Sequence, residues 1–102
     1  FIRICPNIVF LDMKVDDYEI TTVTMDFRQA VTCAMDHLLE LGHRRIAFLG
    51  GVEYAGTGEP VMDERRKAYI SYMKKRKLEY RQWMSQGSFS TVSGYEMMEQ
   101  VL

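Results

Sequence analysis

The sequence predicts an α/β protein with a parallel sheet, of which this chain of 102 residues supplies an incomplete part. Short apolar segments recur at residues 8–11, at 46–49 and, more weakly, at 81–85, and helical periodicity follows each of them. Alternation of strand and helix signals is typical of βαβ units, whose strands run parallel. Doubly wound sheets usually contain about five or six strands. We therefore expect these residues to be a fragment of a larger α/β protein.

The first predicted strand, residues 8–11, is an unbroken apolar run that ends at Asp12. Such a run is expected for a strand covered on both faces of a sheet. A helix is expected to begin after Asp26, because Asp26 and Gln29 have the spacing of a capping box. Gly42 is expected to end it, since glycine readily adopts the left-handed conformation. Apolar residues at helical spacing define the inner face of this helix: Ala30, Val31, Ala34, Met35, Leu38, Leu39 and Leu41.

The second predicted strand, residues 46–49, leads into a pliable loop at residues 50–60 that holds four of the seven glycines of the chain. The start of the next helix is compatible either with Pro60 in its first turn or with Asp63 as its cap. That helix is expected to run to about Lys77. Its inner face is predicted to carry Ala68, Tyr69, Tyr72 and Met73.

The third predicted strand, residues 81–85, is followed by a last helix that Ser90 is expected to cap. The apolar spacing continues to the final residue, which again indicates a fragment. The inner face of this helix is predicted to carry Tyr95, Met98, Val101 and Leu102.

The composition is that of a soluble globular protein, with 47% hydrophobic residues, 26% charged residues and a net charge of -1. This near-neutral charge argues against a basic arm that binds nucleic acid. No apolar run approaches the roughly 18 residues that indicate a membrane-spanning helix. The two cysteines, Cys5 and Cys33, form no CxxC motif. We therefore expect free thiols in a reducing, cytoplasmic compartment.

Motifs for catalysis, metal binding or cofactor binding do not fit this sequence. Residues 51–58 contain neither the lysine of a phosphate-binding loop nor the spacing of a dinucleotide fingerprint. Cys33 and His37 are four residues apart on a predicted helix, but no further ligand lies at zinc-site spacing, so a small buried thiol beside a partly exposed histidine is preferred. The basic stretch at residues 65–77 is interpreted as a solvated helix face. We predict no enzyme, no metal and no cofactor.

Three side chains suited to a polyhydroxylated ligand lie after the predicted strands. Asp12 follows the first strand, Arg65 opens the helix after the second, and Phe89 follows the third. In open α/β sheets, ligands bind beyond the carboxyl ends of the strands. A carboxylate accepts hydrogen bonds from hydroxyls, a guanidinium donates a planar pair, and a phenyl ring offers an apolar face to a sugar. We predict a ligand site here, although each residue alone also fits a turn, a surface charge or a core aromatic.

Several segments of the sequence follow the pattern of one bacterial family. Residues 37–51, HLLELGHRRIAFLGG, are the most specific of them, and residues 10–12, 23–26, 64–69 and 87–95 match in order. Over nearly its whole length, the chain resembles the effector-binding core of transcriptional regulators of the lactose/galactose repressor (LacI/GalR) family.

The resemblance implies a helix-turn-helix headpiece, absent from this chain, followed by a periplasmic-binding-protein-like (Rossmann-like) core of two subdomains. Residues 1–19 would end the first subdomain, residues 20–25 would form a hinge crossover, and residues 26–102 would begin the second subdomain. A small molecule, usually a sugar or purine, would bind between them, at the same three residues that the strand-end argument selects. The implied hinge residues are Ile20, Thr22, Val23, Thr24 and Met25.

The function implied by the resemblance is that of an allosteric sensor rather than an enzyme. A sugar-like effector would reorient the subdomains of a homodimer and so change binding of operator DNA by the headpiece. The sequence departs from the family pattern at Phe27, Ala68 and Lys77, where a small or amide residue, a glycine and a helix-ending glycine are usual. The alternative is a periplasmic sugar-binding protein of a transport system, which shares the two-lobed fold, and an enzyme using the same sheet is a more distant one.

Overall fold

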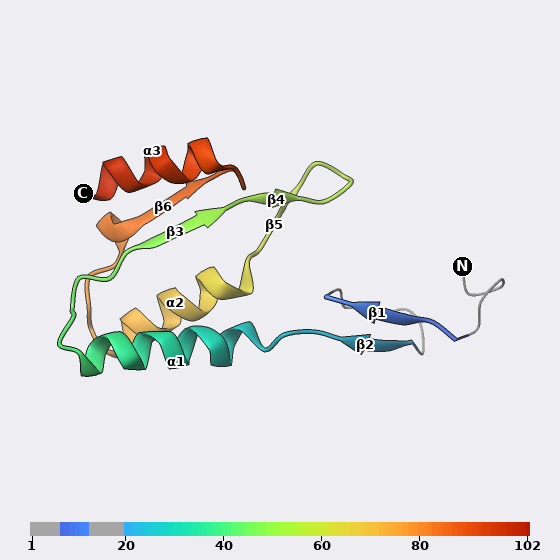
Figure 1. Cartoon of the computed structure of the whole chain (residues 1–102), viewed down its shortest axis with the longest axis horizontal. Coiled ribbons are helices and arrows are strands. Elements are labelled where there is room, and N and C mark those ends of the chain that lie inside the picture. Colours follow the sequence, from blue (N-terminus) through green and yellow to red (C-terminus); the bar gives the residue numbers. More distant parts are fainter. Residues whose placement is uncertain (1–6, 13–19) are drawn as a thin grey trace.

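The computed structural model describes residues 7–12 and 20–102. The thiol expected at Cys5 and the loop at residues 13–19 lie outside this description. The molecule measures 52 × 29 × 19 Å and has a radius of gyration of 17.1 Å, above the roughly 13 Å of a compact chain of this length. Figure 1 shows why: a two-stranded arm extends from a body of helices and strands.

The first helix, α1 (Phe27–Glu40), begins and ends where the sequence predicts. The carboxylate of Asp26 accepts a hydrogen bond from the backbone N–H of Gln29 at 3.0 Å, which satisfies a free donor at the helix start. Gly42 lies just beyond the end with a φ of 91°, in the left-handed region. Part of the predicted inner face packs into the core, namely Val31, Met35, Leu38 and Leu39.

The predicted inner face of α1 is too wide, because α1 packs on one side only, against α2 (Glu64–Lys75). A single neighbouring helix covers a narrow stripe of side chains. The alanines at positions 30 and 34 are exposed, and Leu41 is 61% exposed.

The body contains a βαβ unit in which β3 (Phe48–Gly51) and β6 (Met84–Gly87) run parallel, with α2 as the crossover. This confirms the predicted α/β class with a parallel sheet. The third strand begins later than predicted, since Arg81–Trp83 form a short 3-10 turn, η1. The side chain of Glu79 accepts a hydrogen bond from the backbone N–H of Arg81 at 3.0 Å and favours the turn.

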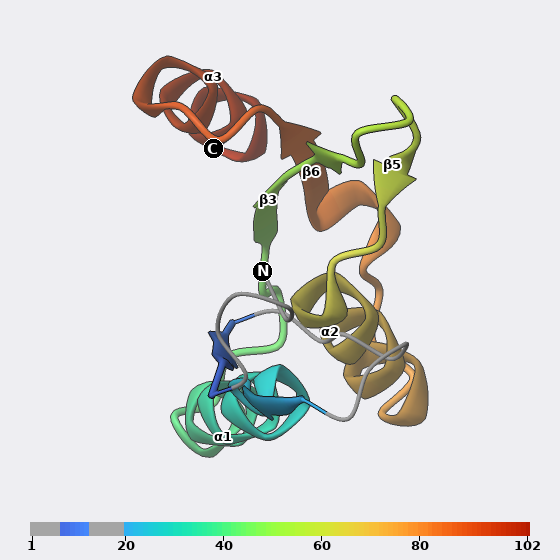
Figure 2. The same cartoon turned by 90° about the vertical axis from the view of Figure 1, so that its right-hand side faces the viewer.

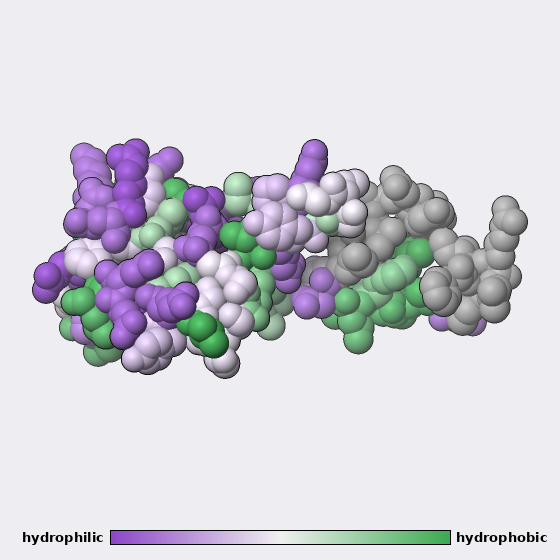
Figure 3. Space-filling model, turned by 90° about the horizontal axis from the view of Figure 1, so that it is seen from above, coloured by the Kyte–Doolittle hydropathy of each residue, from purple (hydrophilic) through white to green (hydrophobic). Residues whose placement is uncertain are grey.

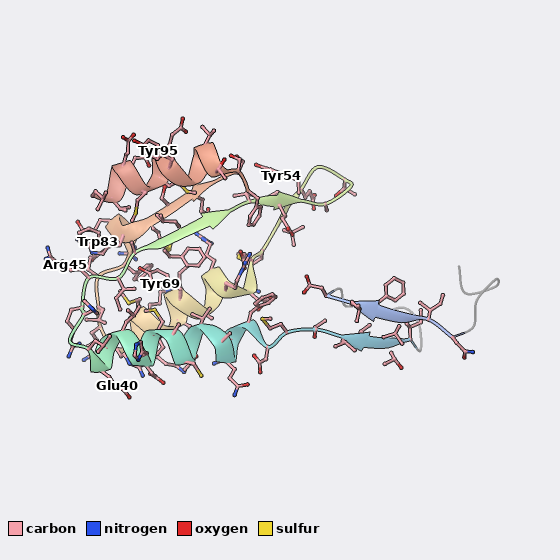
Figure 4. The ribbon with its side chains drawn as sticks, in the orientation of Figure 1. Glu40, Arg45, Tyr54, Tyr69, Trp83 and Tyr95 are labelled. Carbon is pink, nitrogen blue, oxygen red and sulfur yellow. The ribbon has the colours of Figure 1, made fainter. Side chains whose placement is uncertain are left out.

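The hydrophobic core lies between α1, α2 and β3. Tyr69 is 1% exposed and points from α2 toward the sheet (Figure 4). Its hydroxyl donates a hydrogen bond to the carbonyl of Ile46 at 2.7 Å, and its ring stacks on that of Phe48 with centroids 5.3 Å apart. Burial raises the pKa of Tyr69 to about 12. The buried members of the core are Met35, Ile46, Tyr69, Tyr72 and Met73.

The last helix, α3 (Thr91–Val101), covers the face of the β3–β6 sheet opposite to α1 and α2 (Figures 1 and 2). Ser90 caps it, as predicted, by accepting a hydrogen bond from the backbone N–H of Ser93 at 3.1 Å. The predicted inner face is wrong. Met97 is buried against the strand at Gly87, while Tyr95 is 67% exposed and Met98 is 48% exposed.

The glycine-rich stretch between β3 and α2 is a hairpin of β4 (Glu53–Tyr54) and β5 (Pro60–Val61), not an unstructured loop. Because Pro60 lies in a strand, Asp63 is the residue that caps α2. The helix ends at Lys75, and Lys77 has a φ of 54°, the left-handed conformation usual for glycine.

The arm consists of β1 (Val9–Leu11) and β2 (Thr21–Val23), which pair in parallel. The expectation that the first strand is covered on both faces is wrong for the described residues, because β1 lies in a separate two-stranded sheet with β2 and no described helix packs extensively on it. Val9 is therefore 56% exposed and Leu11 is 71% exposed, and Figure 3 shows hydrophobic surface along the arm. None of the helices in residues 7–12 and 20–102 has the length and hydrophobicity needed to cross a membrane.

Candidate ligand-binding site

A cavity of about 570 Å³ opens where the arm meets the body. The end of β1, the first residue of α1, the end of β3, the hairpin and the start of α2 contribute its walls. Asp12, Arg65 and Phe89, the three predicted ligand-binding residues, all line this cavity. The other lining residues are Phe27, Gly51, Glu53, Val61, Met62, Asp63 and Glu64.

Asp12, at the end of the arm, lines the cavity. It follows β1 with a φ of 62°, a left-handed conformation that aspartate tolerates better than most residues. Its backbone N–H donates a hydrogen bond to the carbonyl of Val23 at the end of β2, at 2.8 Å. The backbone of Asp12 is thereby tied to β2, while its carboxylate is available to the cavity.

Arg65 is held by the residue that caps its own helix. The Asp63 carboxylate accepts three hydrogen bonds from Arg65: from its backbone N–H at 2.9 Å, from Nε at 2.9 Å and from Nη2 at 2.8 Å. One carboxylate thus caps α2 and also orients the guanidinium through a bidentate pair. The hydrogen bond from the Arg65 side chain lowers the pKa of Asp63, and the same bond raises the pKa of Arg65, helped by the charges of Asp63, Glu53 and Asp12.

Aromatic rings lie against the Arg65 guanidinium. Its central carbon is 5.3 Å from the ring centroid of Phe27 and 5.9 Å from that of Phe89, within the range of cation–π attraction. The Phe89 ring is 57% exposed and leans on the backbone of Gly51, where a Cβ would stand 2.6 Å from the ring. Glycine at position 51 is therefore needed for Phe89 to reach Arg65.

A second cavity of about 470 Å³ adjoins the first and shares Gly51, Asp63, Arg65 and Phe89 with it. Its other wall is the turn between β6 and α3. The hydroxyls of Ser88 and Ser90 lie 3.0 Å apart there. The two cavities meet at Arg65, so this guanidinium is the central polar group of the site.

The charges around the first cavity favour a neutral ligand. Its lining includes the four carboxylates of Asp12, Glu53, Asp63 and Glu64 but only one basic side chain, Arg65. A phosphate or carboxylate group would be repelled by this excess of negative charge. Hydroxyl groups fit better, because carboxylates accept hydrogen bonds from them and a guanidinium donates to them. Among residues 7–12 and 20–102, no three His, Cys, Asp or Glu side chains gather as metal ligands would.

The predicted hinge residues lie between the arm and the body. Thr22 and Val23 belong to β2, Ile20 precedes it, and Thr24 and Met25 connect it to the capping residue of α1. Met25 is 63% exposed. The only connection shown between arm and body in the described part of the chain is this short extended segment (Figure 1).

The sequence does not predict three of the residues that line the cavity as part of the ligand site. Asp63 is expected only as one of two possible helix starts, although the Asp-x-Arg spacing is a usable signal for a carboxylate that binds the arginine. Phe27 was noted only as a departure from the family pattern. Glu53 had no sequence signal, because its place beside Arg65 depends on the fold of the hairpin.

An α/β unit with a polar cavity beyond the carboxyl ends of its parallel strands is the architecture of a small-molecule-binding domain. Comparison with known proteins identifies it further. Residues 35–102 match the periplasmic binding protein-like domain, and the chain belongs to that family.

The relatives of this chain confirm its resemblance to the LacI/GalR family. It is 31% identical over 96 residues to the HTH-type transcriptional regulator GalR of Lacticaseibacillus casei, covering 93% of this chain and 29% of that protein. It is 33% identical over 94 residues to the regulator GanR of Bacillus subtilis (strain 168), covering 90% of this chain and 28% of that protein. The chain therefore spans less than a third of the length of these relatives.

A solved structure supports the same fold. The LacI family transcriptional regulator from Lactobacillus casei with bound sucrose superposes with a TM-score of 0.71 at 22% identity, over 90% of this chain and 33% of that one. The fold expected from the sequence, a periplasmic-binding-protein-like α/β subdomain, is confirmed.

Proposed function

We propose that this chain forms part of the effector-binding core of a bacterial transcriptional regulator and that its cavity binds a neutral, sugar-like molecule. The observation that carries the proposal is the cavity itself, in which Asp63 orients Arg65 beside Phe27 and Phe89, and which Asp12 also lines. Arg65 donates hydrogen bonds to neighbouring hydroxyls, Asp12 accepts from others, and Phe89 packs on the apolar face of the ring.

The proposed mechanism uses the division between arm and body. Asp12 belongs to the arm, whereas Arg65 and Phe89 belong to the body. A ligand that contacts all three residues favours the arrangement in which they lie close together. It shifts the equilibrium only to the extent that it binds that arrangement more tightly than the other. Residues 20–25 are the proposed hinge, between a first subdomain ending at residue 19 and a second beginning at residue 26.

The partners of the intact protein follow from this proposal. Operator DNA would be bound by a headpiece that is not part of this chain, and the two subdomain arrangements would present the headpieces of a homodimer differently. We infer a cytoplasmic protein without catalytic activity. Cys33 is exposed, so the expectation of a buried thiol is wrong, but a free thiol is compatible with a reducing compartment.

The alternative is a sugar-binding protein of a transport system, which uses the same two-lobed architecture. The relatives favour the regulator, because both are named HTH-type transcriptional regulators. The coding sequence upstream separates the alternatives: a helix-turn-helix segment supports the regulator, and a signal peptide supports transport.

The proposal is tested by measuring DNA binding of the full-length protein to its own promoter region by fluorescence anisotropy. We expect one or more neutral mono- or disaccharides to change the DNA affinity, and the corresponding sugar phosphates to have no effect. DNA binding that responds to no sugar, or that responds only to a sugar phosphate, would contradict the proposal.

A further inference from the structure

Phe27 stands at the junction between the crossover and the ligand-binding cavity. It is the first residue of α1, directly after the Asp26 cap, and its backbone N–H donates a hydrogen bond to the carbonyl of Met25 at 3.1 Å. Its ring lies against the Arg65 guanidinium at 5.3 Å and lines the cavity. A phenylalanine at this place has no role in helix capping, which Asp26 performs through its own carboxylate.

The contacts of Arg65 leave the tilt of its guanidinium plane unrestrained by hydrogen bonds to Asp63. The Asp63 carboxylate holds the edge of the guanidinium through Nε and Nη2, but an edge contact does not by itself stop the plane from tilting about the line between the two groups. The Phe27 ring, with its centroid 5.3 Å from the central carbon of the guanidinium, lies within the range of cation–π attraction, and this attraction opposes that tilt. The Arg65 side chain is 43% exposed, so few other contacts restrain it.

The two aromatic neighbours of Arg65 differ in how firmly they are anchored. Phe89 is 57% exposed and follows the short strand β6, in the turn that leads to α3. Phe27 is half-buried and belongs to the 14-residue helix α1, which packs along α2. Phe27 is therefore the firmer support of the two.

We propose that Phe27 is a positioning residue of the ligand site, whose ring fixes the tilt of the Arg65 guanidinium so that its donors point into the cavity. This rests on the proposed function, in which a sugar-like ligand binds at Arg65. Because Phe27 directly follows the crossover and the cap, a movement of the crossover would be transmitted to the guanidinium through this ring.

The test compares three variants of the full-length protein with the wild type. Phe27→Leu removes the ring, Phe27→Tyr keeps it, and Tyr54→Leu removes an aromatic ring from the hairpin, where Tyr54 is 67% exposed and does not line the cavity. The first readout is the Nε–H resonance of Arg65 in arginine-labelled NMR spectra, assigned by its loss in Arg65→Lys. The second is the affinity for sucrose, galactose and glucose by calorimetry.

We expect Phe27→Leu to shift the Arg65 resonance, because the ring current of Phe27 is lost, and to weaken sugar binding roughly tenfold, as removal of a partly desolvated cation–π contact predicts. Phe27→Tyr should restore both values, and Tyr54→Leu should change neither. An unshifted resonance or an unchanged affinity in Phe27→Leu would overturn the proposal, as would a failure of Phe27→Tyr to restore them. If the wild type binds no sugar, the proposed function fails separately, and an Arg65 resonance in Phe27→Leu that equals that of the wild type still overturns the contact on which the positioning role rests.

Discussion

Substitutions at Asp63 separate its two roles, which are capping α2 and orienting Arg65. Asparagine at position 63 keeps a side-chain oxygen for the cap but loses the negative charge of the pair, whereas alanine loses both. Asn and Asp cap helices about equally well, and replacing either by Ala costs roughly 1 kcal/mol. The stability difference between the wild type and Asp63→Asn therefore measures the ion pair, and the difference between Asp63→Asn and Asp63→Ala measures the cap.

The expected magnitudes follow from the exposure of the pair. Its side chains are 43% exposed at Arg65 and 16% exposed at Asp63, so solvent screens much of the attraction. A well-formed pair of this kind contributes about 0.5–1 kcal/mol. We expect Asp63→Asn to lower the free energy of unfolding by about 0.5–1 kcal/mol and Asp63→Ala by about 1.5–2 kcal/mol at neutral pH.

The same pair predicts a pH dependence. Hydrogen bonding to Arg65 lowers the pKa of Asp63 in the folded protein below its ordinary value of 3.8. The stabilisation by the pair is therefore fully present above that ordinary value and is lost as the pH falls through the folded pKa. The stability difference between wild type and Asp63→Asn should accordingly shrink below pH 3.8.

Urea denaturation of the full-length proteins, followed by far-ultraviolet circular dichroism from pH 7 downward, measures these differences. The ion-pair role of Asp63 is refuted if Asp63→Asn is as stable as the wild type at neutral pH, or if the stability difference between them does not decline in acid. The capping role is refuted if Asp63→Ala and Asp63→Asn are equally destabilised, because the cap would then contribute nothing.

Other substitutions give further tests. Gly51→Ala places a Cβ 2.6 Å from the Phe89 ring, so the ring must move away from Arg65, and calorimetry should show several-fold weaker ligand binding; unchanged affinity would refute the role of that packing. Tyr69→Phe leaves the buried carbonyl of Ile46 without its donor and should cost about 1–1.5 kcal/mol in urea denaturation, so a neutral effect would contradict the assignment. Lys77→Gly relieves a left-handed backbone with a φ of 54° and should stabilise the protein by about 0.5–1 kcal/mol; destabilisation would show that the lysine side chain has another role.

The features predicted best from the sequence are those decided by local chemistry. The caps of α1 and α3 are at Asp26 and Ser90, as expected, and Gly42 follows the end of α1. A capping side chain and the backbone donor it satisfies lie within a few residues of each other, so no tertiary information is needed. The meeting of Arg65 and Phe89 agrees with the shared direction of β3 and β6, whose carboxyl ends face one side. Asp12 follows β1 of a separate sheet, so the strand-end rule does not by itself account for its place in the cavity.

The features missed by the sequence argument depend on contacts between distant segments. The inner face of α3 was misassigned because Met97, rather than Tyr95, faces the strand beside Gly87. The exposure of Leu11 on β1 was missed because apolar content alone does not tell whether another element covers the face of the strand. The place of Glu53 near Arg65 required the hairpin, which glycine content had suggested to be a loop.

Arg65 is the residue through which we propose that a sugar-like ligand binds this domain. The most direct measurement is a calorimetric titration of the full-length wild type, Arg65→Ala and Arg81→Ala with a sugar that changes DNA binding. Arg81 is the matched control, since its guanidinium also lies against an aromatic ring, that of Tyr80 at 5.6 Å, but does not line the cavity. We predict that Arg65→Ala abolishes the heat of sugar binding and keeps DNA affinity, while Arg81→Ala binds like the wild type. Sugar affinity that is unchanged in Arg65→Ala would contradict the account.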